Sequence, residues 1–131
     1  MKKNLRRPTW GVKTEWVPVE ELPVTPTGIK EIAIDLETKD PRLKSHGPGW
    51  PTGHGDVVGI AVAYEGFNAY LPMAHEGGGN LDRKLVMRWF EKEIAKHPSD
   101  KIFYNAAYDV GWLGWLGIEL EGQIIDAMLA A

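Results

Sequence analysis

Apolar stretches separated by polar and glycine-rich segments predict a layered α/β domain. Three strands are predicted in the first half of the chain, over 31–36, 57–64 and 67–72. Glu65-Gly66 separates the last two, which favours an antiparallel hairpin. The segment 38–56 is rich in Gly and Pro, and we expect a long irregular loop there.

The second half of the chain alternates between helical and extended patterns. A helix is predicted over 82–97 because apolar residues recur at spacings of one, three and four. A short strand at 102–104 leads into a helix over 105–116. Extended stretches at 118–120 and 123–125 then flank a turn at Glu121-Gly122 and supply a further strand, and a last helix starts near Asp126. This order predicts a mixed sheet, three antiparallel strands and then parallel ones, flanked by helices.

The composition is that of an ordinary globular domain. The chain has 131 residues, of which 44% are hydrophobic and 25% charged, enough for one domain with its own core. No run approaches 18 apolar residues, so we expect no membrane-spanning segment. The absence of cysteine excludes disulfides and thiolate metal sites, and it fits a reducing cytoplasm.

Charge is unevenly distributed along the chain. The net charge is −3, but residues 1–30 carry six Lys or Arg and three Glu, giving +3, and the remainder carries −6. Four prolines and no sustained periodicity predict that 1–30 is an extended N-terminal arm. Such an arm can contact phosphates, although a solvated tail is the simpler explanation. The acidic remainder does not exclude a nucleic-acid substrate, because bound metal ions can bring in a polyanion.

Two carboxylates stand at the end of the first strand. Asp35 and Glu37 are two residues apart, so strand geometry puts them on one face. For this pair alone, solvated acids at a strand end are an equally good explanation. Two acids aimed together repel each other unless a cation lies between them, so the pair is a candidate metal site.

A second polar group follows the next predicted strand–helix junction. Asn105 and Asp109 are four residues apart, which puts them on one face of the predicted helix. Taken singly, Asp109 is explained as helix-surface charge and Asn105 as a helix N-cap. If the helix crosses beside the end of the first strand, Asp109 approaches Asp35 and Glu37. Three carboxylates, an amide and no cysteine form a hard-oxygen site suited to Mg²⁺ or Mn²⁺.

Six short motifs carry a resemblance that covers residues 31–131. They are Ile34-Asp35-Leu36-Glu37-Thr38, Gly59-Ile60-Ala61-Val62-Ala63, Ala69-Tyr70-Leu71-Pro72, Asn105-Ala106-Ala107-Tyr108-Asp109, Gly117-Ile118-Glu119-Leu120 and Ile125-Asp126-Ala127-Met128-Leu129. In order and spacing they resemble the proofreading 3′–5′ exonuclease domain of family A, DNA polymerase I-like, DNA polymerases. The resemblance implies a ribonuclease H-like fold of the DEDD exonuclease type, preceded by the arm 1–30.

The resemblance also implies catalytic roles. Asp35 and Glu37 would be ligands of one divalent ion, Mg²⁺ or Mn²⁺, and Asp35 and Asp109 would hold a second. The two ions would support hydrolysis of the 3′-terminal phosphodiester of DNA, which releases nucleoside monophosphates during proofreading. Contacts to the substrate are expected from three further positions, Thr38, Asn105 and Tyr108.

The same resemblance implies partners and a setting. The substrate would be a single-stranded or frayed 3′ end of DNA, bound mostly through backbone contacts and stacking on aromatic side chains. A polymerase domain would follow in the same chain or be a separate protein. We therefore expect a cytoplasmic protein of a bacterial or phage-infected cell, without a membrane partner.

The family pattern is incomplete in this chain. The family requires a fourth acid on a later helix, with a Tyr or His four or five residues before it, and no such motif follows Asp126. Asp126 matches a family position that we interpret as structural, such as a helix cap. His75 and His97 are expected to be loop, surface or core histidines with no further role. We expect the exonuclease domain to lack its last helices, which would leave an apolar strip of the sheet uncovered. The isolated chain would then be weakly active and marginally stable, or it would complete its site with another chain.

Two other functions remain open. A DEDD-type 3′–5′ exoribonuclease would carry the same three acids, and it would differ in how it treats the 2′ position of the substrate. A non-catalytic nucleic-acid-binding module with an exonuclease fold would use the surface of the fold without its chemistry. Substrate preference separates the first from a DNA exonuclease, and binding of Mn²⁺ separates the second.

Overall fold

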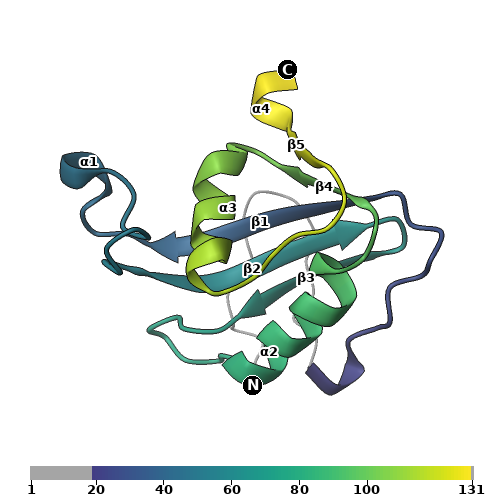
Figure 1. Ribbon diagram of the computed structural model, residues 1–131. Coiled ribbons are helices and arrows are strands. Elements are labelled where there is room, and N and C mark those ends of the chain that lie inside the picture. Colours follow the sequence, from purple (N-terminus) through teal and green to yellow (C-terminus); the bar gives the residue numbers. More distant parts are fainter. Residues whose placement is uncertain (1–18, 131) are drawn as a thin grey trace.

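The centre of the molecule is a five-stranded sheet in the order β3-β2-β1-β4-β5 (Figure 1). The computed structural model describes residues 19–130. The strands are β1 (Glu31–Lys39), β2 (Asp56–Tyr64), β3 (Phe67–Pro72), β4 (Asp100–Phe103) and β5 (Ile124–Asp126). The helices are η1 (Val19–Glu21), α1 (Leu43–His46), α2 (Arg83–Trp89), the π-helix η2 (Phe90–Ala95), α3 (Ala106–Trp115) and α4 (Ala127–Ala130).

The strand directions confirm the predicted mixed sheet. β1 pairs antiparallel with β2, and β2 pairs antiparallel with β3. On the other side of β1, β4 and then β5 run parallel to it. The molecule is therefore an α/β fold, and the helices flank the sheet as expected.

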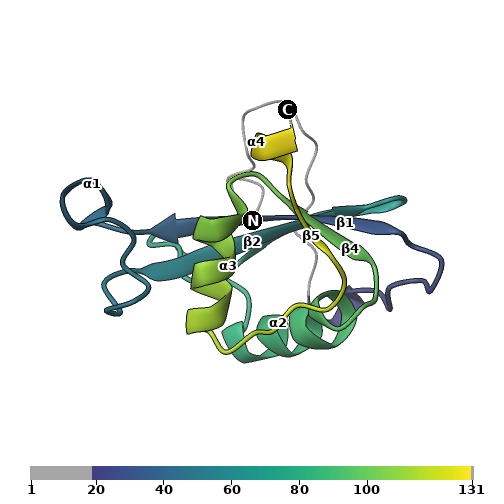
Figure 2. The ribbon, with the colours of Figure 1, turned by 45° about the horizontal axis from the view of Figure 1, so that its top comes forward.

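Alternating burial along β1 defines the two faces of the sheet. Ile32, Ile34 and Leu36 are buried, and the residues between them are exposed. The buried face packs against apolar side chains of α2, η2 and α3, namely Val86, Phe90, Ile94, Trp112 and Leu113. Figure 2 shows α2 on one side of the sheet and α4 on the other. The acids predicted at the end of β1 lie on the face opposite this core.

β1 is longer than the strands beside it on the parallel side. It pairs with β4 only over residues 31–33, whereas its pairing with β2 continues to Lys39. Beyond residue 33, the edge of β1 that faces β4 is therefore free to receive another group. This is the part of β1 that carries Asp35 and Glu37.

The boundaries differ from the predicted ones in a few places. The segment 38–56 contains the short helix α1, because a single helical turn has too few residues to show a periodic pattern. The helix predicted over 82–97 changes from α to π geometry at Phe90. β4 begins at Asp100, two residues before the predicted strand. None of the helices in the described part of the chain is long and apolar enough to cross a membrane.

Residues 19–30, the described part of the predicted N-terminal arm, pack against the helical layer. The indole Nε1 of Trp89 donates to the carbonyl oxygen of Pro23 at 2.9 Å. The ring Nε2 of His97 lies 2.9 Å from the carbonyl oxygen of Pro26. His97 thus has the structural role predicted for it, and the remainder of the arm lies outside the described residues.

Lys101 on β4 is a fully buried cation. Its Nζ donates to the backbone carbonyl oxygens of His97, Ser99 and Glu121 at 2.5–2.9 Å. Burial lowers the pKa of this ammonium group. The three bonds join the turn before β4 to the segment that leads into β5, and so they help fix the parallel half of the sheet.

Candidate active site

The end of β1 presents Asp35 and Glu37 on the exposed face of the sheet. Both residues are exposed, and both follow the alternation of the strand. The pairing register with β2 shifts between Glu37 and Thr38, where a β-bulge interrupts the ladder. A bulge bends the strand and changes the direction of the side chains beside it. Thr38 is half-buried and lies on the side of α3, whereas Glu37 stays on the open face.

Asp109 of α3 reaches the backbone of β1 between the two strand acids. Its carboxylate Oδ2 accepts a hydrogen bond of 3.3 Å from the backbone N–H of Leu36. Only 5% of Asp109 is exposed. The bond uses the edge of β1 that β4 leaves free. Asp109 thus approaches β1 at the residue between the two acids and interacts with the charge of Asp35, and burial contradicts the alternative of a surface charge on the helix.

The electrostatics of the three acids reflect their proximity. Desolvation, followed by repulsion from Glu37, raises the pKa of Asp35 above its usual range. Burial raises the pKa of Asp109 to about 7; the hydrogen bond from Leu36 opposes this shift, and repulsion from Asp35 adds to it. Glu37 therefore makes ionisation of Asp35 less favourable, and Asp35 makes ionisation of Asp109 less favourable. A cation between the acids would relieve both effects.

The donor atoms suit a hard divalent ion, although they are not yet gathered around one point. Within residues 19–130, no group of three or more His, Cys, Asp or Glu side chains has the arrangement of a formed metal site. The chemistry of the set still fits, since it consists of carboxylates and contains no thiolate. Asp35 is exposed, so its side chain has room to turn toward an ion held beside Glu37 and Asp109.

The three predicted substrate residues share one cavity of about 570 Å³. Thr38, Asn105 and Tyr108 line it together with Leu43, Pro48 and Trp50 from the segment between β1 and β2. The hydroxyls of Thr38 and Tyr108 lie 2.9 Å apart, and the Tyr108 hydroxyl donates to Asp40 Oδ2 at 2.8 Å. The cavity thus has polar groups at the end of β1 and an apolar wall from Leu43, Pro48 and Trp50, none of which the sequence analysis named as a site residue.

Asn105 is not part of the helix that it was predicted to begin. Its φ is +68°, in the left-handed region that asparagine tolerates better than most residues, and its side chain makes no capping hydrogen bond. Instead Asp126 Oδ1 and Oδ2 accept the backbone N–H groups of Asn105 and Ala106, each at 2.9 Å. A residue twenty positions later caps α3, which leaves the exposed Asn105 side chain free to line the cavity.

Asn105 stands at the N-cap position of α3, although its side chain makes no capping hydrogen bond there. The expectation that Asn105 and Asp109 lie on one face of the same helix is wrong. A helical spacing argument holds only inside a helix, and α3 begins at Ala106. The interpretation of Asp126 as a structural cap is confirmed. Partial desolvation by itself would raise the pKa of Asp126. The backbone N–H donors, first those of Ala106 and Asn105, outweigh it, and the pKa of Asp126 is lowered.

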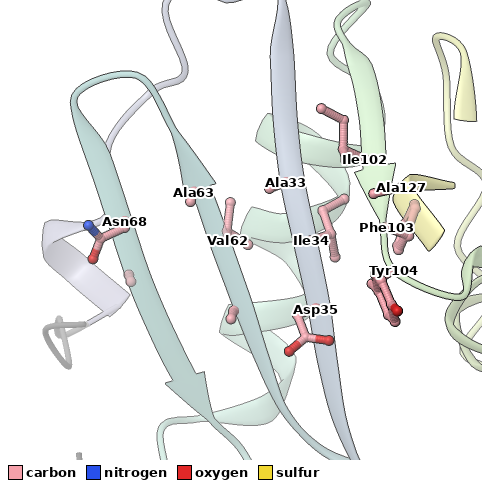
Figure 3. Close-up of a pocket in the computed structure, with 12 residues that line it drawn as sticks. Ala33, Ile34, Asp35, Val62, Ala63, Asn68, Ile102, Phe103, Tyr104 and Ala127 are labelled. Carbon is pink, nitrogen blue, oxygen red and sulfur yellow. The ribbon is translucent and has the colours of Figure 1, made fainter. Parts of the chain in front are cut away.

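A second cavity, of about 510 Å³, lies on the open face of the sheet beside Asp35 (Figure 3). Small side chains form much of its lining, among them Ala33, Ala61, Ala63 and Ala69. Figure 3 shows the Asp35 carboxylate and the Tyr104 ring at one end of this groove. An apolar groove of the predicted kind is thus present, whereas its explanation by absent helices remains a prediction.

Two residues near Glu37 were missed by sequence reasoning. The hydroxyl of Tyr70 on β3 donates to Glu37 Oε1 at 2.7 Å, and His75 Nε2 lies 2.5 Å from the same hydroxyl. His75 was predicted to be a loop, surface or core histidine, and it does lie in the loop after β3, where its ring also contacts Tyr70. A signal was present in Gly59, since a lone glycine inside an apolar strand indicates a close approach by another group.

Comparison with known proteins gives two relatives, and no family model matches the chain. The chain is 38% identical over 116 residues to a DNA-directed DNA polymerase of Pseudomonas phage M6. The matched region is 84% of this chain and 17% of that polymerase. The chain is also 30% identical over 79 residues to a DNA polymerase I of Synechocystis sp., covering 58% of this chain and 8% of that protein. This chain is related to DNA polymerases. It spans less than a fifth of the length of either curated relative.

Proposed function

We propose that residues 31–131 form a 3′–5′ exonuclease domain of the kind that proofreads for family A DNA polymerases. The reaction is hydrolysis of the terminal phosphodiester at a single-stranded or frayed 3′ end of DNA. Water adds to the phosphorus, the bond to the 3′ oxygen of the shortened strand breaks, and a nucleoside monophosphate leaves. Relatedness to DNA polymerases supports this proposal.

One observation carries the proposal. The buried Asp109 carboxylate meets the backbone of Leu36, the residue between Asp35 and Glu37, across a sequence separation of 73 residues. Burial of an ionised carboxylate lowers the stability of the fold unless the group is paired with a cation or hydrogen-bond donors, and the pKa of about 7 reflects this cost. A functional role would explain why such a group is present. The hydrogen bond fixes Asp109 where its charge and that of Asp35 interact.

Asp35, Glu37 and Asp109 would hold the divalent ions, Mg²⁺ or Mn²⁺. When bound, two such ions activate water as a nucleophile and stabilise the leaving 3′ oxygen. The residues of the chain itself hold the carboxylates in place. Asp109 is fixed by Leu36 and Glu37 by Tyr70, and the burial of Asp109 keeps bulk water from one side of the site.

The sheet order supports a ribonuclease H-like fold for this domain. Three antiparallel strands are followed by parallel ones, and the order 3-2-1-4-5 makes β1 the central strand. The acids thus stand on the central strand and on the helix that follows β4. The cavity lined by Thr38, Asn105 and Tyr108 opens beside them and would receive the terminal nucleotide.

Replacement of Asp35 by Ala tests the proposal. Because an ion contributes several kcal/mol to the transition state, and each 1.4 kcal/mol is tenfold in rate, loss of a ligand should slow release of nucleoside monophosphates by at least about 100-fold. The fourth family acid is not among the assigned residues, so turnover should be slow and affinity for Mn²⁺ is the primary measurement. Asp35→Ala should weaken it at least about tenfold.

Glu31→Gln is the matched control, since Glu31 is an exposed acid on the same face of the same strand. It should bind Mn²⁺ and digest single-stranded DNA like the unaltered chain. Digestion at the unaltered rate by Asp35→Ala would refute the proposal.

The two alternative functions predict different outcomes in the same assays. An exoribonuclease would degrade RNA faster than DNA of equal sequence, whereas we expect the reverse. A non-catalytic module would bind no Mn²⁺ that Asp35→Ala abolishes.

A further inference from the structure

Glu37 is held by a chain of hydrogen bonds that begins in the loop after β3. The Tyr70 hydroxyl donates to Glu37 Oε1 at 2.7 Å. His75 Nε2 lies 2.5 Å from that hydroxyl and 3.9 Å from Glu37 Oε1. A phenol has one hydrogen, so a hydroxyl that donates to Glu37 accepts from His75. The imidazole must then carry its hydrogen on Nε2.

The backbone of His75 is fixed in turn by Asn80. The His75 N–H donates to Asn80 Oδ1 at 2.8 Å, and Asn80 Nδ2 donates to the His75 carbonyl oxygen at 2.9 Å. The ion pair between Lys39 Nζ and Glu76 Oε2, at 2.7 Å, ties the same loop to the end of β1. The loop after β3 thus presents His75 to the site in a defined position.

Gly59 makes the contact between Tyr70 and Glu37 geometrically feasible. It pairs with Glu37 across the β1–β2 ladder, and a Cβ at this position would lie 1.8 Å from the Tyr70 hydroxyl. Such a distance is far below van der Waals contact. The phenol therefore passes over the bare backbone of β2 to reach β1. Tyr70 itself is 7% exposed, so its ring is rigidly packed.

We propose that Gly59, Tyr70 and His75 position Glu37 for the divalent ion of the candidate active site. This inference rests on the proposed function, because it takes Glu37 to be a metal ligand. Without the hydrogen bonds that link His75, Tyr70 and Glu37, the Glu37 side chain on the exposed strand face would sample several rotamers. The entropy lost when a bound metal fixed one of these rotamers would then reduce the affinity for metal. Tyr70 and His75 act through Glu37 and are positioning residues. They supply orientation, whereas Glu37 supplies the ligand atom.

The test is the affinity of the 131-residue chain for Mn²⁺, measured by electron paramagnetic resonance, with thermal unfolding in EDTA as a second readout. Tyr70→Phe removes only the hydroxyl and keeps the ring. It should weaken Mn²⁺ binding about tenfold, a typical effect of losing a partner of a ligand. Tyr64→Phe is the control, since Tyr64 is on β2 and packs its ring against Phe67, away from Glu37. It should bind Mn²⁺ like the unaltered chain.

A double-mutant cycle separates positioning from general stability. If Tyr70 acts through Glu37, Tyr70→Phe should have no further effect on Mn²⁺ affinity in a Glu37→Gln background. Gly59→Ala should weaken Mn²⁺ binding as Tyr70→Phe does, since it displaces the phenol. His75→Gln keeps an N–H donor and should retain more affinity than His75→Leu.

The outcomes distinguish this inference from the function on which it rests. If Glu37→Gln weakens Mn²⁺ binding but Tyr70→Phe does not, the positioning group is refuted and the exonuclease proposal stands. An equal loss of affinity by Tyr70→Phe with and without Glu37 would also refute positioning, because the effect would then be on the fold. If the unaltered chain binds no Mn²⁺, the exonuclease proposal fails, and this inference fails with it.

Discussion

The Asp109 carboxyl group is buried, and without a bound cation burial opposes the ionised form that a metal ligand requires. Asp109 is 5% exposed, and burial raises the pKa of its carboxyl group to about 7. In the unfolded chain the same group titrates near the ordinary value of 3.8. Between these values the folded chain binds more protons than the unfolded chain, so the free energy of unfolding falls as pH rises. The stabilising contribution of the neutral carboxyl is complete below pH about 4 and is lost as pH rises through about 7.

Asp109→Asn should therefore stabilise the metal-free chain at pH 8. The amide oxygen can still accept from the Leu36 N–H, while the charge that costs free energy is gone. One pKa unit corresponds to about 1.4 kcal/mol, so the gain is expected on the order of a few kcal/mol, shrinking toward zero at pH 4. Urea unfolding in EDTA at both pH values measures it. Equal stability of the two proteins at pH 8 would mean that Asp109 ionises in the folded chain without a loss of stability. Saturating Mn²⁺ should reverse the order of stability, because it should stabilise the unaltered chain alone.

Helix α3 shows how an element can be placed by a residue outside it. Asp126 caps its start, and Trp50 of the 38–56 segment packs on its side at Gly111. A Cβ on Gly111 would lie 2.3 Å from the Trp50 ring, whereas a Cβ on Gly114 would meet nothing within 4 Å. The sequence leaves these two glycines equivalent. Packing makes the two glycines different. Of the two, only Gly111 lies against Trp50, a residue that lines the cavity shared by Thr38 and Tyr108, and the absence of a side chain at Gly111 lets Trp50 approach α3.

Substitution of each glycine by Ala tests this difference. Gly114→Ala should stabilise the chain by about 0.5–1 kcal/mol, because alanine is the better helix former and the site is exposed. Gly111→Ala should destabilise it by about 1–3 kcal/mol, since Trp50 must move. Denaturant unfolding followed by circular dichroism measures both. Equal stabilisation by the two variants would show that Trp50 does not pack on α3.

The whole molecule carries an acidic body, with a charge of −6 over residues 31–131. A polyanionic substrate is therefore repelled at long range unless cations lie at the contact surface. This repulsion should be strongest at the candidate site, because Asp35, Glu37 and Asp109 lie beside the cavity proposed for the terminal nucleotide. Binding of DNA should for this reason depend on divalent ions.

Single-stranded DNA should accordingly bind at least about tenfold more tightly in Ca²⁺ than in EDTA at equal ionic strength, about 1.4 kcal/mol in free energy. Fluorescence anisotropy of a labelled oligonucleotide measures this without turnover if Ca²⁺ does not support cleavage. Asp35→Ala should bind equally under both conditions. Tight binding in EDTA by the unaltered chain would place the substrate on another surface.

The open groove on the sheet is also a property of the whole molecule. Its lining includes five alanines, and it lies beside Asp35 on the face opposite α2. Small side chains on an exposed sheet face are suited to close packing of another element. Because the groove lies next to the candidate site, any element that packed on it would also border Asp35.

Local patterns in the sequence determined the strands, the two main helices and the presence of acids at the end of β1. Alternation and 3.6-residue periodicity act over a few residues, so a single chain segment already contains them. The spacing of Asp35 and Glu37 put them on one face for the same reason. The mixed sheet followed from the order of these elements, whereas the approach of Asp109 was expected only on the condition that the helix after β4 crosses beside the end of β1.

Tertiary structure decided what depends on residues far apart in the chain. The left-handed turn at Asn105 follows from a cap supplied by Asp126, and no pattern near Asn105 contains that information. The Tyr70 and His75 contacts to Glu37 depend on a β-ladder register and on the absence of a side chain at Gly59. Burial of Asp109, and with it the shift of its pKa, arises only when α3 closes on the free edge of β1. Short-range patterns specify the elements, and long-range packing specifies the chemistry of the side chains that they carry.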